Sequence, residues 1–418
     1  MSPTISRKNT YTNTLLDFVL VLLIALIFVP QFKFLSAYNY LCLFVSVLWC
    51  VLAFSQNPRF FLGTSKYFSV SVLFFVLVIA VSFIADNQLL INRYSSFIII
   101  PLFYWIYEYN AIYRSLKSNI KNLFFSLLFI LYTSIQTTLV LILNPFAARS
   151  IKTSAEETGD LISDGVSGYG LIYAVVILVI VLIPMILDGK KLGLSFLGKI
   201  FILVLGGSFL YLIILSNYFT ALIVTIMAIL SIIILYRNRK MLLMLIPLSL
   251  IYFMFQKDIN LTVIDSISSF VQTDGLTHKR LQEIKAGLET GSKTESVDSR
   301  TGVINQSLEL FSEYPILGYA NKPVDRFDLN KVGQHSYVFD TYALFGLFLG
   351  TYSLWIMWLP FHYRIKSNFG YKLKVFSWTV GFAFMILIII NNLTPTMGFA
   401  AFFVFPTVFD YINRKVNG

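Results

Sequence analysis

The segment YGLIYAVVILVIVLIPMIL, residues 169–187, contains no charged side chain. Because an α-helix rises 1.5 Å per residue, about 20 such residues cross a hydrocarbon core about 30 Å thick. Apolar runs of similar length recur along the whole chain. They lie at 15–35, 38–54, 67–85, 94–110, 122–143, 169–187, 200–216, 219–235, 241–256, 336–360, 375–391 and 399–411. The sequence therefore predicts an all-α polytopic membrane protein with about twelve transmembrane helices.

Composition supports this prediction, because 57% of the 418 residues are hydrophobic and only 13% are charged. A soluble domain needs more charge to cover its surface. The first run follows Arg7 and Lys8, but it is longer than a signal-peptide core and no cleavage pattern follows, so we expect a retained span. Cys42 and Cys50 fall inside the second run, where we expect small buried side chains rather than a disulfide or a metal site.

Basic residues are concentrated in every second gap between the spans, and this alternation predicts the topology. By the positive-inside rule the basic gaps and both termini are cytoplasmic, and the opposite gaps lie in the periplasm or at the outer surface of the plasma membrane. The net charge of +11 then reflects topology and contact with anionic lipids, and it requires no nucleic acid. The basic gaps contain Arg7, Lys8, Arg59, Lys66, Arg114, Lys117, Lys121, Lys190, Lys191, Lys199, Arg237, Arg239, Lys240, Arg364, Lys366, Lys372, Lys374, Arg414 and Lys415.

Three regions follow from this topology. Residues 1–256 form spans one to nine, with one polar outer loop at 144–168 that is either ordered or a mobile flap. Residues 257–335 form a large extracytoplasmic helical loop between spans nine and ten. Residues 336–418 form spans ten to twelve and a short cytoplasmic tail.

The large loop is predicted to contain two helices. The first is THKRLQEIKAGLETG, residues 277–291, which is polar and ends at a glycine. The second lies within DSRTGVINQSLELFSEYP, residues 298–315, beginning at Asp298 or Ser299 and ending before Pro315. Val303, Ile304, Leu308 and Phe311 give it an apolar stripe, so we expect it to lie on the membrane surface or on the ends of the spans.

His335 is the histidine best placed for chemistry among the three in the chain. It lies at the outer start of the tenth predicted span, whereas His278 and His362 fall in charged surface segments. An imidazole with a pKa near 6.5 can accept a proton at neutral pH, which suits a general base. The alternative is a histidine anchored at the membrane interface.

Arg300 is expected in the first turn of the second loop helix, where unpaired N–H groups and a guanidinium could hold a phosphate. The alternative is an arginine that reaches lipid headgroups. Lys322, Arg326 and Lys331 form a basic rim that would attract an anion toward His335. Asp340 is expected to face the bundle interior. A carboxylate near the membrane core costs free energy, so we also consider a functional role for it.

No cluster with metal-ligand spacing and no phosphate-binding GxxxxGK[ST] loop is found, so we expect no metal, no cofactor and no nucleotide hydrolysis. The energy for a reaction outside the membrane then has to come from the substrate.

Two segments together resemble the O-antigen ligase and O-antigen polymerase superfamily. They are DSRTGVINQSLELFSEYPILGYANKPVDRF, residues 298–327, and GQHSYVFDTYALFGLFLGTYSLW, residues 333–355. The matching features are Arg300, the turn Pro315–Gly318, the triplet His335, Ser336 and Tyr337, and Gly346. SDGVSGYGLIYAVV, residues 163–176, is also similar to the start of the family's sixth span.

The sequence departs from the family pattern at two positions of interest. Ser336 replaces the asparagine that usually follows the histidine, and Tyr218-Phe219 replaces a Ser-Arg pair at the start of a span. Arg93, Arg149 or Lys152 from other outer loops could supply the missing cation.

The resemblance implies a metal-independent glycosyl transfer from an undecaprenyl-diphosphate-linked glycan. His335 would act as base and Arg300, with Arg326, Arg149 and Arg93, would bind the diphosphate; Asp340 and Tyr337 are secondary candidates. A polymerase, with such lipids as both donor and acceptor, is favoured, and a chain-length regulator protein is a further expected partner. A ligase that transfers the glycan to lipid A core is the alternative. A flippase or small-anion carrier is a second alternative, but it should place ionisable groups or broken helices near the midplane.

Overall fold

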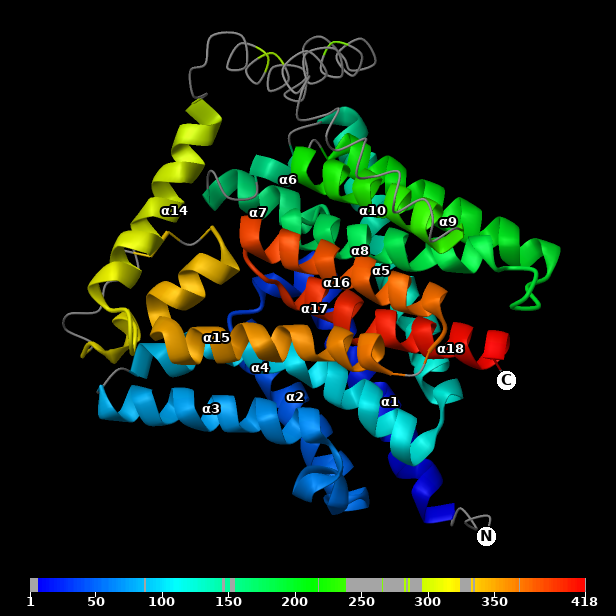
Figure 1. Ribbon diagram of the computed structural model, residues 1–418, viewed down its shortest axis with the longest axis horizontal. Helices are drawn as coiled ribbons and strands as arrows, with labels where there is room; N and C mark the ends of the chain where they lie inside the picture. Colours follow the sequence, from blue (N-terminus) through cyan, green and yellow to red (C-terminus); the bar gives the residue numbers. More distant parts are fainter. Residues whose placement is uncertain are drawn as a thin grey trace.

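The computed structural model describes residues 7–85, 88–144, 147–150, 155–216, 218–237, 295–323, 332–333, 335–367 and 369–417, together with positions 265, 282 and 285. These residues form helices joined by short turns, and none of them lies in a strand (Figure 1). The predicted all-α class is therefore confirmed.

Every predicted span except the ninth coincides with a helix. The ninth, 241–256, lies outside the described residues, as does the predicted helix 277–291 apart from positions 282 and 285. Eight described helices are long and apolar enough to cross a membrane, and the shorter helices Lys66–Val81 and Phe219–Leu235 are also apolar. The helices at the predicted spans are α1 (Arg7–Phe28), α2 (Tyr38–Gln56), α3 (Lys66–Ile84), α4 (Gln88–Tyr109), α5 (Leu116–Leu143), α8 (Tyr169–Leu187), α9 (Phe196–Leu215), α10 (Phe219–Arg237), α15 (Tyr337–Lys366), α16 (Tyr371–Ile390), α17 (Pro395–Phe399) and α18 (Phe405–Asn417).

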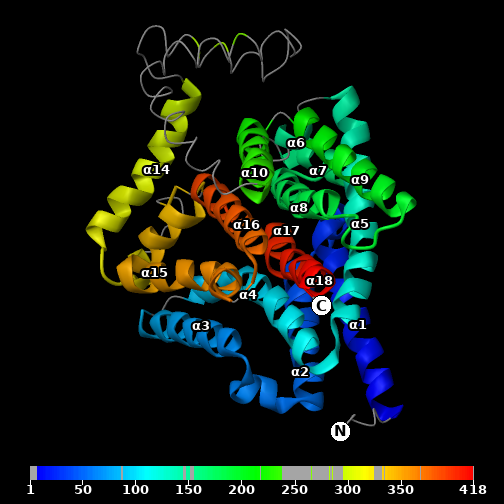
Figure 2. The same ribbon diagram turned by 45° about the vertical axis from the view of Figure 1, so that its right-hand side comes forward.

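The centre of the bundle is formed by α8 and by the last span, Pro395–Val416. Residues 171–181 of α8 are all buried, and α8 contacts α9, α10 and α17. Figure 2 shows α8 and α17 near the middle, with α3 and α15 on one side and α5 and α9 on the other. Because α8 is apolar on all faces, it requires apolar surroundings, which the neighbouring helices provide.

Polar contacts join several helices at the basic gaps. Asp17 of α1 forms an ion pair with Arg114 at 2.7 Å and accepts a hydrogen bond from Asn122 of α5 at 2.8 Å. Arg364 of α15 is buried, and its guanidinium lies 4.9 Å from the ring centre of Tyr107. Two residues that predict the topology therefore also stabilise helix packing, because a buried charge requires such partners.

The structure corrects the predicted end of the first span and adds detail to the outer loop. The first helix ends at Phe28, not near residue 35, because Pro30 begins a 3₁₀ turn, η1 (Pro30–Phe34). The described residues of the outer loop 144–168 include the short helices α6 (Ala147–Ser150) and α7 (Ala155–Ser163).

The tenth span is not a straight helix, because α15 breaks at Gly346. The backbone of Gly346 has φ 67° and ψ −167°, values that helical residues do not adopt. The hydroxyls of Tyr337 and Ser353 are 2.7 Å apart, although residues 16 positions apart on a straight helix are separated by about 24 Å. A first segment of α15, Tyr337 to Phe345, therefore folds back on the longer segment that follows Gly346.

Candidate active site

The break in α15 is held by the turn that follows α14 (Glu295–Glu313). The N–H of Leu347 donates to the carbonyl of Pro315 at 2.8 Å. A Cβ atom added to Gly318 would lie 2.2 Å from the Leu344 carbonyl oxygen, and one added to Gly346 would lie 2.3 Å from that of Ile316. Two glycines that the resemblance singled out therefore allow one backbone contact between the turn and the helix.

A second contact fastens α14 to the residues before α15. Ser307 of α14 accepts a hydrogen bond from the Gly333 N–H at 3.0 Å and donates one to the Asp340 carboxylate at 2.7 Å. Ser307 and Asp340 are buried, and a Cβ on Gly333 would lie 2.0 Å from the Val303 carbonyl oxygen. Asp340 thus faces the interior as predicted, and it links α15 to α14.

His335 lies between this contact and the start of α15. Its side chain is exposed, whereas Gly333 and Ser336 on either side are buried. Ser336 donates to the Ile389 carbonyl of α16. The Tyr337 N–H donates to the Asn391 carbonyl at 3.2 Å. The histidine is therefore displayed at the surface by a backbone that α14 and α16 hold on both sides.

Ser336 explains why the chain can depart from the family's asparagine at this position. Its hydroxyl accepts a hydrogen bond from the Phe339 N–H at 3.3 Å and so caps α15. Serine and asparagine are about equally good N-caps, so either residue can begin this helix next to the histidine.

We expect Ser336→Ala to lower the free energy of unfolding by about 1–2 kcal/mol, because both side-chain hydrogen bonds are lost. Ser336→Asn restores the cap and should recover most of that stability. Thermal unfolding of the purified variants in detergent measures both effects. Equal melting temperatures for Ser336→Ala and the wild type would show that the cap does not hold α15.

The structure describes the predicted arginines less completely than it describes His335. Arg300 is the sixth residue of α14, because this helix begins at Glu295 and not at Asp298 or Ser299. The expected seat on first-turn N–H groups is therefore wrong. The positions of Arg93 and Arg149 lie in α4 and α6, and Arg326 lies outside the described residues, as does Lys152.

Helical periodicity nevertheless places position 300 on the face of α14 that contacts the segment before His335. Arg300 precedes Ser307 by seven residues, which is about two helical turns, so both positions are on the same face of α14. Ser307 is the residue that binds Gly333, two positions before His335.

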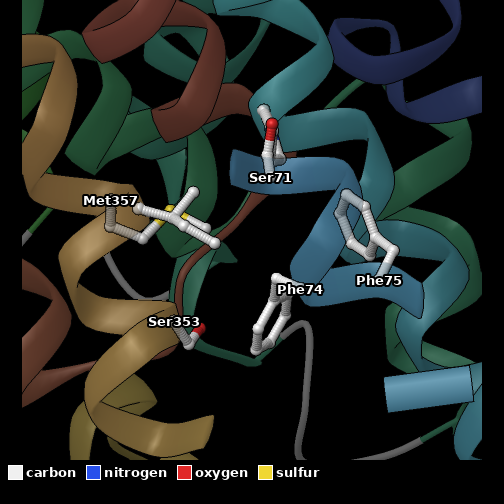
Figure 3. A pocket seen from close by; sticks show the side chains of 7 residues that line it. Ser71, Phe74, Phe75, Ser353 and Met357 are labelled. Carbon is white, nitrogen blue, oxygen red and sulfur yellow. The ribbon is translucent and has the colours of Figure 1, made fainter. Parts of the chain in front are cut away.

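Tyr337 lies inside the bundle, where its hydroxyl contacts Ser353. Ser353 lines a void between α3 and α15, shown in Figure 3 with Ser71, Phe74 and Met357. This void has no room for a water molecule, so the seam between the helices is closely packed. The structure gives Tyr337 a packing role in the fold of α15.

A pocket of about 340 Å³ lies close to the same loop that supports His335. Asn391, whose carbonyl accepts from Tyr337, is three residues before Thr394, which lines the pocket. Lys33 of η1 and Tyr218, the residue directly before α10, also line it. Residue spacing did not reveal this pocket, because its lining comes from segments far apart in the sequence.

Within the described ranges, no group of three or more histidine, cysteine or carboxylate side chains could hold a metal ion. Cys42 and Cys50 are both free thiols; Cys42 is buried, as the sequence predicted, whereas Cys50 is half-buried.

The sequence model of a family described as O-antigen ligase matches residues 200–352. The match includes Arg300, the turn Pro315–Gly318, His335 and Gly346. Residues 200–352 are therefore similar to this family, which supports the resemblance to the O-antigen ligase and polymerase superfamily. The chain is a multi-pass membrane protein, and the family implies an enzyme that transfers glycosyl groups. No curated protein matches the chain.

Proposed function

We propose that the protein is a polymerase that joins undecaprenyl-diphosphate-linked oligosaccharide repeat units into a surface polysaccharide, O-antigen or capsule. The observation that carries the proposal is the exposed His335, held by α14 and α16 within the segment that matches the ligase family. An exposed imidazole on a rigid backbone suits a base that must meet a large glycan acceptor.

In the proposed reaction, a hydroxyl oxygen of the acceptor glycan attacks the anomeric carbon of the donor. The bond from that carbon to the diphosphate oxygen breaks, and the polyprenyl diphosphate leaves with the electron pair. The acceptor hydroxyl proton passes to His335. The diphosphate supplies the driving force, so the balanced reaction requires no nucleotide, and cations alone can stabilise the leaving charge.

Arg300 is proposed to hold the diphosphate, because its position is on the α14 face that carries Ser307. A guanidinium binds two phosphate oxygens at once, which an ammonium cannot do. Arg326, Arg93 and Arg149 remain candidates for further contacts.

The proposed setting is the outer face of a bacterial inner membrane, with both termini in the cytoplasm and a chain-length regulator as partner. Supporting this orientation, α1 begins and α18 ends on the side of the bundle away from α14 in Figure 1. The basic loops then contact anionic lipids, and His335 and α14 face outward.

The test is reconstitution of the purified protein in vesicles with one lipid-diphosphate repeat unit as the sole substrate. A polymerase is expected to produce a ladder of glycans of increasing length on a gel. A chain that is inert until lipid A core is added is a ligase, which is the alternative activity and the one that the family description names.

The break in α15 favours a transporter as a second candidate, because transporters bind substrates at broken helices. The same reconstituted vesicles distinguish a transporter from the proposed enzyme. A flippase moves the labelled repeat unit to the other leaflet without forming a glycosidic bond, whereas the proposed enzyme forms the bond.

A further inference from the structure

The pocket near the Asn391–Thr394 loop is large enough to hold a small polar ligand. Its volume of about 340 Å³ falls within the range of ligand pockets, roughly 300–1,000 Å³. The described residues that line it combine one charged side chain, that of Lys33, with several hydroxyl groups and three tyrosine rings, and none of them is a carboxylate. Because a few polar groups fix the ligand of such a pocket, the lining indicates the chemistry of that ligand.

The aromatic part of the lining consists of Tyr38, Tyr169 and Tyr218. Two contacts fix Tyr218: its hydroxyl donates to the Ala148 carbonyl at 3.0 Å, and its ring centre is 5.9 Å from that of Tyr173. A tyrosine offers an apolar ring and a polar hydroxyl. A sugar ring has the complementary surface, because its C–H groups can pack on an aromatic face while its hydroxyls form hydrogen bonds. The pocket therefore suits a sugar.

Two threonines hold their hydroxyls at the start of α8. The Thr396 hydroxyl donates to the Gly170 carbonyl at 2.7 Å, and the hydroxyl oxygens of Thr394 and Thr396 are 3.0 Å apart. A Cβ atom added to Gly170 would lie 3.1 Å from the Thr396 hydroxyl oxygen, so glycine at this position allows the close approach. This polar side of the pocket is ordered before a ligand binds, which reduces the entropy lost on binding.

Ser167 gives an independent sign of a ligand. It lines the pocket, it is only 8% exposed, and its hydroxyl makes no hydrogen bond to any described residue. Its backbone N–H donates to the Thr137 hydroxyl of α5 at 3.1 Å, which holds the residue in place. A buried hydroxyl without a partner costs free energy, and a hydrogen bond to a ligand in the pocket would remove that cost.

Lys33 adds a positive charge that the described residues do not neutralise. None of their carboxylates lies within ion-pair distance of Lys33. Although part of the residue is exposed, burial of its ammonium group disfavours the charged form and lowers the pKa of Lys33 below its ordinary value. A bound anion would offset this cost. The lining therefore favours a sugar with a negative charge over a neutral one.

The pocket lies within reach of a glycan bound at His335. Thr394 follows Asn391 by three residues, so at most about 11 Å of chain separates them. The Asn391 carbonyl accepts a hydrogen bond from the N–H of Tyr337, which is two residues after His335. An oligosaccharide that meets His335 can therefore place another of its sugars in the pocket.

We infer that this pocket is a subsite for an acidic sugar of the repeat unit, such as a hexuronic acid, whose carboxylate binds Lys33. Ser167 binds a hydroxyl of the same sugar, and the tyrosines pack on its ring. The inference rests on the proposed function for the identity of the glycan and adds a specificity to it. Repeat units with an acidic sugar are bound more tightly than those in which the corresponding sugar is neutral.

The test measures binding, not transfer. A panel of oligosaccharides that contain a carboxylate-bearing sugar is titrated into the full-length protein in nanodiscs. Each is compared with its own counterpart in which the carboxylate has been reduced to an alcohol. An acidic member of the panel is expected to bind at least about tenfold more tightly than its reduced counterpart, because the latter lacks a charge-assisted contact. Inorganic phosphate and pyrophosphate, which carry charge without a sugar ring, should not displace it.

Variants of the pocket identify the groups responsible. Lys33→Met keeps the length of the side chain and removes its charge, so it should abolish the preference for the acidic glycan without weakening the reduced one. Lys33→Arg should retain the preference. Ser167→Ala should weaken both glycans without lowering the melting temperature of the unliganded protein.

Two matched controls should bind both glycans as the wild type does. Lys199→Met removes a lysine from the first turn of α9, and Ser163→Ala removes an exposed serine of α7.

Equal affinity for acidic and reduced glycans, an unchanged preference in Lys33→Met, or a panel with no member that binds would overturn the inference. Displacement by phosphate alone would mean that the pocket binds phosphate and not a sugar. Ladder formation tests the polymerase separately. Ladders from neutral and acidic repeat units at equal rates, together with equal binding, would leave the polymerase intact and contradict the subsite. Lysine-dependent binding of acidic glycans by a protein that forms no glycosidic bond would support the subsite and contradict the polymerase.

Discussion

Replacing His335 by alanine is expected to slow glycosyl transfer by about 10²- to 10⁴-fold, the usual contribution of a general base. The rate of ladder formation in reconstituted vesicles measures the effect. The side chain is exposed, and the backbone on both sides is held by Ser307 and Asn391. Alanine at this position should therefore leave the folded protein in the membrane in normal amounts.

His362→Ala is the matched control. It removes an exposed histidine from the other end of α15, and we expect the wild-type rate. A ladder of normal length and rate from His335→Ala would mean that another group removes the acceptor proton.

Gly318→Ala is expected to have the largest effect on folding. The backbone of Gly318 has φ 76° and ψ 172°, a region that only glycine adopts readily and that costs an alanine about 1–3 kcal/mol. The new methyl group would lie 2.2 Å from the Leu344 carbonyl oxygen and 2.4 Å from the Gly346 nitrogen, both backbone atoms that cannot turn away. With overpacking of about 1–3 kcal/mol added, we expect a loss of about 2–6 kcal/mol in unfolding free energy.

Thermal unfolding and size-exclusion chromatography in detergent measure this loss. Gly207→Ala is the control, because a Cβ at Gly207 meets no heavy atom within 4 Å; it should be neutral or stabilise α9 by up to about 1 kcal/mol. Gly346→Ala should behave as Gly318→Ala does, since it disturbs the same contact. If both variants have the same melting temperature as the wild type, the turn after α14 does not hold the break in α15.

Most of the helices could be predicted because membrane spans are local properties of the sequence. The run 169–187 is apolar throughout, so it forms a helix wherever it is placed in a bilayer, and α8 has these same bounds. The end of α14 before Pro315 could also be predicted, since proline cannot continue a helix. The span 15–35 was predicted too long because the apolar run continues past Pro30 while the helix does not.

The candidate site was predictable in part. The exposed position of His335 at the start of a helix follows from the composition on either side of it. The role of Ser336 as a cap is visible in the sequence once the helix start is known. The pocket that Lys33 and Tyr218 both line could not be predicted, because it depends on how η1 and α10 pack.

The sequence by itself determined which segments become helices in a membrane, because length and apolarity act within each segment. Only the tertiary structure decided where α15 bends, that α14 is bound to it through Ser307, and that Lys33 lies in the pocket with Tyr218. These features depend on contacts between residues up to about 200 positions apart, which no local pattern encodes.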